Sequence, residues 1–233
     1  MGSSFTLADT PTLDDLQVFL ARAARIEEGS VRLIAGSGVL AAYAAVFYPQ
    51  GLLDESPTVL GLRTVALTDP AETFDVVVPI RSLLQRLETA QSTRRAAVAA
   101  GKPDADGAVT ITLPMEVNTV TWSAISPPRG GWHAIEGTAP GVLDHAARSG
   151  IDEVAGAVPD AVGEQIVRRV RSEVWSRGIE GLEHVPAGAA FAALSLGFLG
   201  DDEVKMFETG PWTRLTTLRG HVLVKRKAWT LAR

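Results

Sequence analysis

Residues 33–53 form a run of 21 positions without a charged side chain, and no other segment constrains the fold more strongly. A run of this length is long enough to cross a bilayer as a helix. It is interrupted, however, by Gly36-Ser37-Gly38, Pro49 and Gly51, which favour turns and end helices. Small and large side chains also alternate along the run, as they do in strands. We therefore expect a buried β-hairpin here and no membrane span.

The composition is that of an ordinary globular protein. Of the 233 residues, 46% are hydrophobic and 21% are charged, which argues against disordered and collagen-like classes. The absence of cysteine excludes thiol nucleophiles, cysteine zinc sites and disulfides. A chain of this length buries enough surface to be stable without metal or disulfide. We expect one compact domain over residues 1–233, and a division into two lobes near residues 126–131 stays open.

Strand-like and helical patterns fall in different parts of the sequence. Helical spacing occurs over residues 12–28 and from Ile80 onward, and after residue 139 it predominates up to residue 199. The strand-like runs before residue 125 are 30–35, 39–48, 60–67, 73–78, 109–113 and 117–122, and those at the end are 204–207, 213–218 and 221–227. This segregation favours an α+β fold over regular βαβ winding. The prediction is an antiparallel sheet in the N-terminal half, a helical C-terminal half and a terminal β-ribbon.

Charge is distributed unevenly along the chain. The net charge is −5, yet residues 209–233 contain six basic side chains and no acidic one, so residues 1–208 carry −11. A basic segment on an acidic protein favours docking to an anionic partner or to an acidic surface of the protein itself.

Three local patterns are similar to catalytic or cofactor sites, and each fails a structural requirement. Gly36-Ser37-Gly38 has the form of a dinucleotide-binding turn, but Pro49 and Gly51 would interrupt the helix that must follow. Ser195 and His221 follow the order of a hydrolase triad, but only 26 residues separate them. His133 and Glu136 have a chelating spacing, but the preceding glycines disfavour a helix there. We expect no cofactor and no metal, and we assign no catalytic residue.

Two segments have the composition of binding loops, Pro127–His133 and Gly210–Arg214. Each combines a tryptophan with an arginine beside turn residues, and these side chains dominate protein interfaces and stack on bases. The alternative is that each tryptophan fills the core at a corner of the sheet. With the basic residues of the C-terminal segment, the candidate binding residues are Arg129, Trp132, His133, Trp212, Arg214, Arg219, Lys225 and Lys227.

A resemblance to a known family rests on three stretches of the sequence. They are EVKMFETGPWTRL at residues 203–215, ALSLGFLG at residues 193–200, and the helix of residues 12–26 leading into residues 31–42. Together they resemble a family of uncharacterised proteins from high-GC Gram-positive bacteria, over most of the chain. The resemblance implies a cytoplasmic bacterial protein and no particular chemistry.

These observations favour a non-catalytic interaction protein, an adaptor or regulator whose partner is another protein or a second copy of the chain. Two alternatives stay open, a small-molecule enzyme built from scattered carboxylates and histidines, and a nucleic-acid-binding protein that uses its basic C-terminal segment. A deep pocket with convergent Asp, Glu or His side chains of shifted pKa would favour the enzyme.

Overall fold

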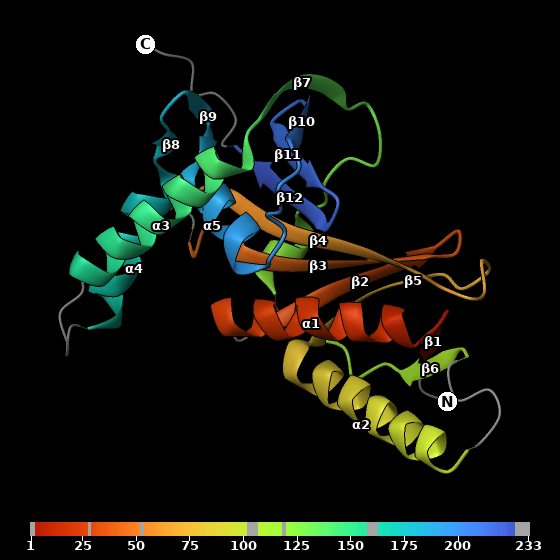
Figure 1. Ribbon diagram of the computed structural model, residues 1–233. Helices are drawn as coiled ribbons and strands as arrows, with labels where there is room; N and C mark the ends of the chain where they lie inside the picture. Colours follow the sequence, from red (N-terminus) through yellow and green to blue (C-terminus); the bar gives the residue numbers. More distant parts are fainter. Residues whose placement is uncertain are drawn as a thin grey trace. The chain divides into compact units, whose positions relative to one another are not determined.

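The computed structural model describes residues 3–27, 29–51, 54–101, 107–117, 120–157 and 163–226 (Figure 1). The chain divides into two compact units. Unit 1 comprises Met1–Ala44 and Leu62–Ala124, and unit 2 comprises Ala45–Gly61 and Ile125–Arg233. The unit boundaries fall within the strands β3 (Val39–Phe47) and β4 (Thr58–Ala66), so these strands contribute to both units.

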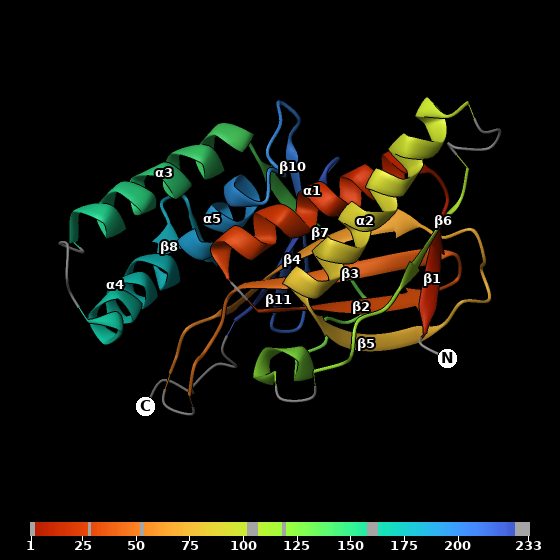
Figure 2. The same ribbon diagram turned by 90° about the horizontal axis from the view of Figure 1, so that it is seen from below.

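Unit 1 combines a sheet with two long helices. Its further elements are β1 (Ser4–Leu7), α1 (Thr10–Ile26), β2 (Ser30–Gly36), β5 (Phe74–Pro79), α2 (Ile80–Ala99), β6 (Val109–Thr112) and the 3₁₀ helix η1 (Thr121–Ala124). Figure 2 shows α1 and α2 lying side by side over one face of the strands. The helix predicted over residues 12–28 is confirmed as α1. It begins two residues earlier because the Asp9 side chain accepts a hydrogen bond from the Thr12 amide at 2.8 Å.

The hairpin predicted from the uncharged run is confirmed by β2 and β3. Its turn consists of Ser37 (φ 53°) and Gly38 (φ 76°), and two consecutive residues with positive φ are typical of a type I′ turn. The chain leaves this turn as a strand paired with β2, from Gly36 with Val39 to Val31 with Ala44. A dinucleotide-binding turn needs a helix at this point, so the structure excludes that alternative.

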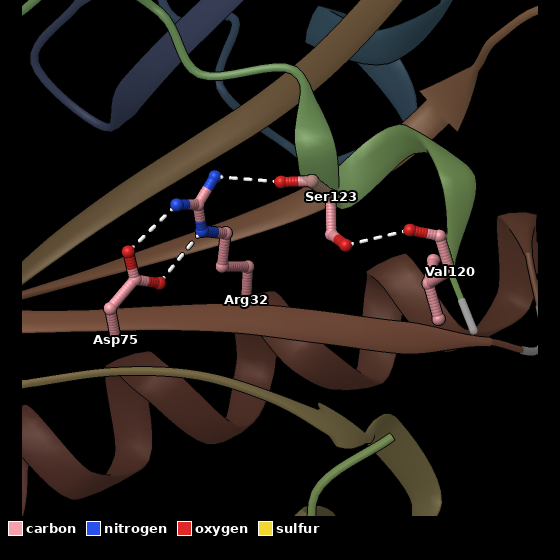
Figure 3. A network of polar contacts seen from close by, with 4 residues as sticks. All are labelled: Arg32, Asp75, Val120 and Ser123. Atoms are coloured by element: carbon pink, nitrogen blue, oxygen red, sulfur yellow. Dashed lines mark hydrogen bonds and ion pairs between the residues drawn. The ribbon is translucent and has the colours of Figure 1, made fainter. Parts of the chain in front are cut away.

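The polar network of Figure 3 attaches η1 to the sheet of unit 1. Arg32 of β2 donates to both carboxylate oxygens of Asp75 on β5, at 2.8 and 2.7 Å, and to the carbonyl of Ser123 at 2.8 Å. The Ser123 hydroxyl donates in turn to the Val120 carbonyl at 2.7 Å. The hydrogen bond from Arg32 to Asp75 raises the pKa of the arginine. Bidentate pairing of this kind fixes geometry, so η1 is held in one position on the strands.

Unit 2 alternates strands and helices along the chain. Its further elements are β7 (His133–Thr138), α3 (Pro140–Ala157), α4 (Glu164–Ser176), β8 (Gly178–Ile179), β9 (Leu182–Pro186), α5 (Ala187–Ser195), β10 (Val204–Thr209), β11 (Trp212–Thr217) and β12 (Gly220–Lys225). The first part of the helical spacing predicted after residue 139 forms one helix, α3, which passes through Gly150. None of the helices in the part of the chain that the structure describes is long and apolar enough to span a bilayer.

The predicted division into a strand-rich N-terminal half and a helical C-terminal half is wrong. The main sheet has eight strands in the order β5-β2-β3-β4-β12-β11-β10-β7, so strands from both ends of the chain enter it. The expected terminal β-ribbon, β10 to β12, is the continuation of this sheet, because β12 neighbours β4 and β10 neighbours β7. Periodicity along a sequence identifies strands but not their pairing partners, and here the pairing joins segments more than 150 residues apart.

Two further predictions about the sheet are also wrong. Strand β6 does not extend the main sheet but pairs with β1, from Ser4 opposite Thr112 to Leu7 opposite Val109. The strand-like run at 117–122 ends in η1, whose Trp122 is buried. A short apolar run of this kind fits a buried helical turn as well as a strand, so the sequence pattern does not distinguish the two. The glycines, proline and aspartates of residues 101–107 predict a loop, but positions 102–106 lie outside the described residues.

Candidate functional site

The candidate residues of the C-terminal segment lie on the strands of unit 2. Residues directly opposite each other in antiparallel strands project to the same face. The register places Phe207 opposite Arg214 and Arg214 opposite Leu223, and it places Met206 opposite Leu215 and Leu215 opposite Val222. The second set is buried, so that face belongs to the core of unit 2. The first set lies on the other face, where Phe207 and Arg214 are half-buried and Leu223 is buried.

We call this second face the basic–aromatic face and define it by Trp132, Lys205, Phe207, Arg214 and Lys225. The guanidinium carbon of Arg214 lies 4.6 Å from the ring centroid of Trp132 and 4.5 Å from that of Phe207. Trp132 reaches this place from the loop before β7, and its indole N–H donates to the Pro128 carbonyl at 3.0 Å. Cation–π contacts of this geometry stabilise both the cation and the position of the rings. The two segments that the sequence singled out separately therefore meet at one arginine.

Electrostatics on this face are dominated by cations. Lys205 is exposed, and Lys225 and Arg214 are half-buried. Burial lowers the pKa of Arg214, although arginine keeps its charge at neutral pH. Lys225 stands opposite Trp212 in the register, which places both on the basic–aromatic face, but Trp212 is only 4% exposed.

The remaining candidate residues take no part in the contacts of Arg214 with Trp132 and Phe207, and each has its own surroundings where the structure describes it. Arg219, in the turn between β11 and β12, donates to the Leu199 carbonyl at 2.8 Å. His133 stands opposite Glu208 in the register, on the core side of the strands, and is exposed at the start of β7. Arg129 is exposed in the loop before β7, and Lys227 lies outside the described residues.

Sequence reasoning missed Phe207 and Lys205. The sequence pattern contained both residues, because Val204 and Met206 alternate with Lys205 and Phe207 along β10. In the structure only Val204 and Met206 are buried. An aromatic residue on the side of the strand opposite the core is a candidate for binding.

Unit 2 also contains a cavity of about 600 Å³ between α3, the end of α4 and β8. Its titratable lining residues are His145, Glu153, Arg177 and Glu180. Glu153 accepts two hydrogen bonds from Arg177, at 2.8 and 2.9 Å, and these lower the pKa of the glutamate. A lowered pKa keeps the carboxylate ionised and paired, whereas a general acid needs a raised one.

Metal ligation finds no support in the described part of the chain. No cluster of three or more histidine or acidic side chains suited to a metal ion occurs there. The proposed chelating pair, His133 and Glu136, lies in strand β7 and not on a helix. Ser195, the apparent nucleophile, is the last residue of α5.

Comparison with solved structures identifies the fold. Pol III beta from Caulobacter crescentus superposes with a TM-score of 0.52 at 12% identity, over 99% of this chain and 66% of that one. The DNA polymerase sliding clamp from Caulobacter crescentus has a TM-score of 0.48 at 11% identity, over 99% and 69% of the two chains. The DNA polymerase III subunit beta from Pseudomonas aeruginosa has a TM-score of 0.47 at 15% identity, over 99% and 66%. The fold of this chain is thus similar to that of pol III beta, of which the chain spans just under two thirds.

Family models divide the sequence in two. Residues 1–107 match a model described as Domain of unknown function (DUF8010), and residues 127–229 match one described as Domain of unknown function (DUF8185). The comparison with curated proteins found no match.

Proposed function

We propose that this chain is a non-catalytic interaction protein, an adaptor or regulator that binds a protein partner through the basic–aromatic face of unit 2. The observation that carries the proposal is the contact of Arg214 with both Trp132 and Phe207 on one sheet face. Tryptophan and arginine are the side chains most enriched in binding hot spots, and clustering of such residues is typical of an interface centre. The cytoplasmic location expected from the sequence remains part of this proposal.

Two further observations support it. The solved structure that superposes with a TM-score of 0.52 is named pol III beta, a name for one component of a polymerase. The carboxylate in the cavity of unit 2 that has a shifted pKa is paired with Arg177, which is an arrangement for structure and not for proton transfer. The interaction protein is therefore favoured over the small-molecule enzyme.

Nucleic-acid binding is the second candidate function. The basic residues of β10 to β12 favour it, because lysine and arginine neutralise phosphates while an aromatic ring stacks on bases. The names of the proteins of similar fold, which refer to a DNA polymerase, also favour it. The net charge of −11 over residues 1–208 opposes it, because that charge repels a polyanion.

Site-specific photo-crosslinking in the native cells tests the proposal. A photoreactive phenylalanine analogue replaces Thr209 or Thr216, which lie on the basic–aromatic face beside its defining residues. The matched control carries the analogue at Ser92, an exposed position of α2 in unit 1. We expect a defined protein adduct from Thr209 and Thr216 that resists nuclease and is absent from Ser92. Nuclease-sensitive adducts would favour the second candidate, and the lack of any adduct specific to the face would contradict both.

A further inference from the structure

Within the described ranges, the guanidinium of Arg214 contacts two aromatic rings and no hydrogen-bond acceptor. Its Nε is buried and has no hydrogen-bond partner among the described residues, and over the same ranges the structure shows no hydrogen bond or ion pair of its other nitrogens. A buried polar group without a hydrogen bond is costly, and a charged group more so, which is why such groups are nearly always paired. The terminal nitrogens of Arg214 are not among the buried unpaired atoms, so an acceptor from another molecule is able to bind the guanidinium there.

The geometry of the ring contacts defines what kind of acceptor fits. The guanidinium carbon of Arg214 lies over the ring of Trp132 and over that of Phe207. Rings bound to a guanidinium accept no conventional hydrogen bond from it, so the terminal N–H groups of Arg214 remain donors for an acceptor. Carboxylates and phosphates are the groups that accept two parallel hydrogen bonds from arginine. The rings also hold the side chain still, so that less freedom is lost on binding.

The charges around Arg214 favour an anionic ligand too. Lys205 lies on the next strand and Lys225 at the end of β12, both on the basic–aromatic face. The one acidic side chain of β10, Glu208, projects to the core side, where it accepts hydrogen bonds from Thr213 and Arg226 at 3.3 and 3.0 Å. A ligand on the basic–aromatic face thus meets three cations.

We infer that Arg214 anchors a carboxylate of an acidic segment in a protein partner, with Lys205 and Lys225 contacting neighbouring acidic side chains. This inference rests on the proposed function and adds the chemistry of the partner. A carboxylate is preferred over a nucleic-acid phosphate because the net charge of residues 1–208 repels an extended polyanion more strongly than a short acidic segment.

Side-chain NMR of the full chain tests the inference directly. The Nε–H resonance of Arg214 is assigned by its disappearance in the Arg214→Lys variant. The probes are a glutamate–glycine repeat peptide, the matching glutamine–glycine peptide and an oligothymidylate of the same length. We expect the resonance to shift with the glutamate peptide, added to about 1 mM, the range in which weak contacts are detected. It should not shift with the glutamine peptide.

Affinity measurements by fluorescence anisotropy provide the second readout. Arg214→Lys keeps the charge but loses the planar fork, and we expect it to weaken binding of the glutamate peptide by about tenfold or more. The matched control is Arg169→Gln, which removes an exposed cation on α4 and should leave the affinity unchanged. The NMR spectrum of Arg214→Lys also shows whether the variant is folded, because a folded variant keeps all the other resonances in place.

The other outcomes overturn the inference. If only oligothymidylate shifts the Arg214 resonance, the anchored group is a phosphate and the partner is a nucleic acid. If Arg169→Gln weakens binding as much as Arg214→Lys, attraction is diffuse and Arg214 is no anchor. If none of the three probes shifts the resonance while the protein cross-link at Thr209 and Thr216 forms, the proposed function stands and the carboxylate anchor is refuted.

Discussion

Replacing Gly150 by alanine should destabilise unit 2, although alanine is the better helix former. A Cβ atom at Gly150 would lie 2.4 Å from Cζ3 and 2.8 Å from Cη2 of Trp175, both closer than carbon atoms approach without displacement. Trp175 is 2% exposed and stacks on Phe191 with ring centroids 4.6 Å apart, so displacing the indole disturbs this stack. Overpacking lowers the free energy of unfolding by about 1–3 kcal/mol, and a weakened aromatic stack lowers it by about 0.5–1.5 kcal/mol. The higher helix propensity of alanine raises it by about 1 kcal/mol. We expect a net loss of about 1–3 kcal/mol.

Gly156 provides the matched control in the same helix. No heavy atom lies within 4 Å of a Cβ built at Gly156, so Gly156→Ala should raise the free energy of unfolding by up to about 1 kcal/mol. Urea unfolding followed by far-UV circular dichroism measures both variants, and an unchanged slope against urea shows that the midpoints report stability. A Gly150→Ala protein as stable as Gly156→Ala would refute the close packing of α3 on Trp175.

Three further predictions concern polar contacts. Arg63 of β4 pairs with Asp15 of α1 through two hydrogen bonds of 2.6 and 2.7 Å. Because the pair is partly exposed, Arg63→Gln should lower the free energy of unfolding by about 0.5–1 kcal/mol, and by less at high salt. Urea unfolding at two salt concentrations measures this change. The pKa of Glu153 is lowered by Arg177, so its contribution is present above the unfolded pKa of about 4.3 and is lost as the pH falls through the lower folded pKa. Glu153→Gln should therefore flatten the acid limb of the stability profile, and an unchanged limb would contradict the pairing. Asp75→Asn, which removes the negative charge and one of the two oxygens that accept from Arg32, should speed amide exchange in η1 more than in β2.

Local structure could be predicted where neighbouring residues decide it. The hairpin of residues 33–53 follows from a turn whose residues tolerate positive φ, and the helix from Ile80 follows from its apolar spacing. Gly150 shows the limit of such reasoning. A glycine suggests a helix end, yet α3 continues through Gly150. The position requires glycine because Trp175, 25 residues further on, occupies the space that a side chain would fill. A glycine required for packing and one required for a turn are identical in a single sequence.

The candidate site likewise combines residues that the sequence identified with contacts that only the tertiary structure shows. Composition alone selected Trp132 and Arg214, since arginine and tryptophan beside turns suit binding surfaces. Only the tertiary structure decided that the two meet, that Phe207 joins them, and that Trp212 is buried. The physical reason is that strand register brings together residues far apart in the chain, through backbone hydrogen bonds that every residue type except proline is able to form. The sequence by itself determined most of the strands of the main sheet and two of the side chains that meet on the basic–aromatic face, Trp132 and Arg214. The pairing of β12 with β4 and of β10 with β7 determined where those side chains lie.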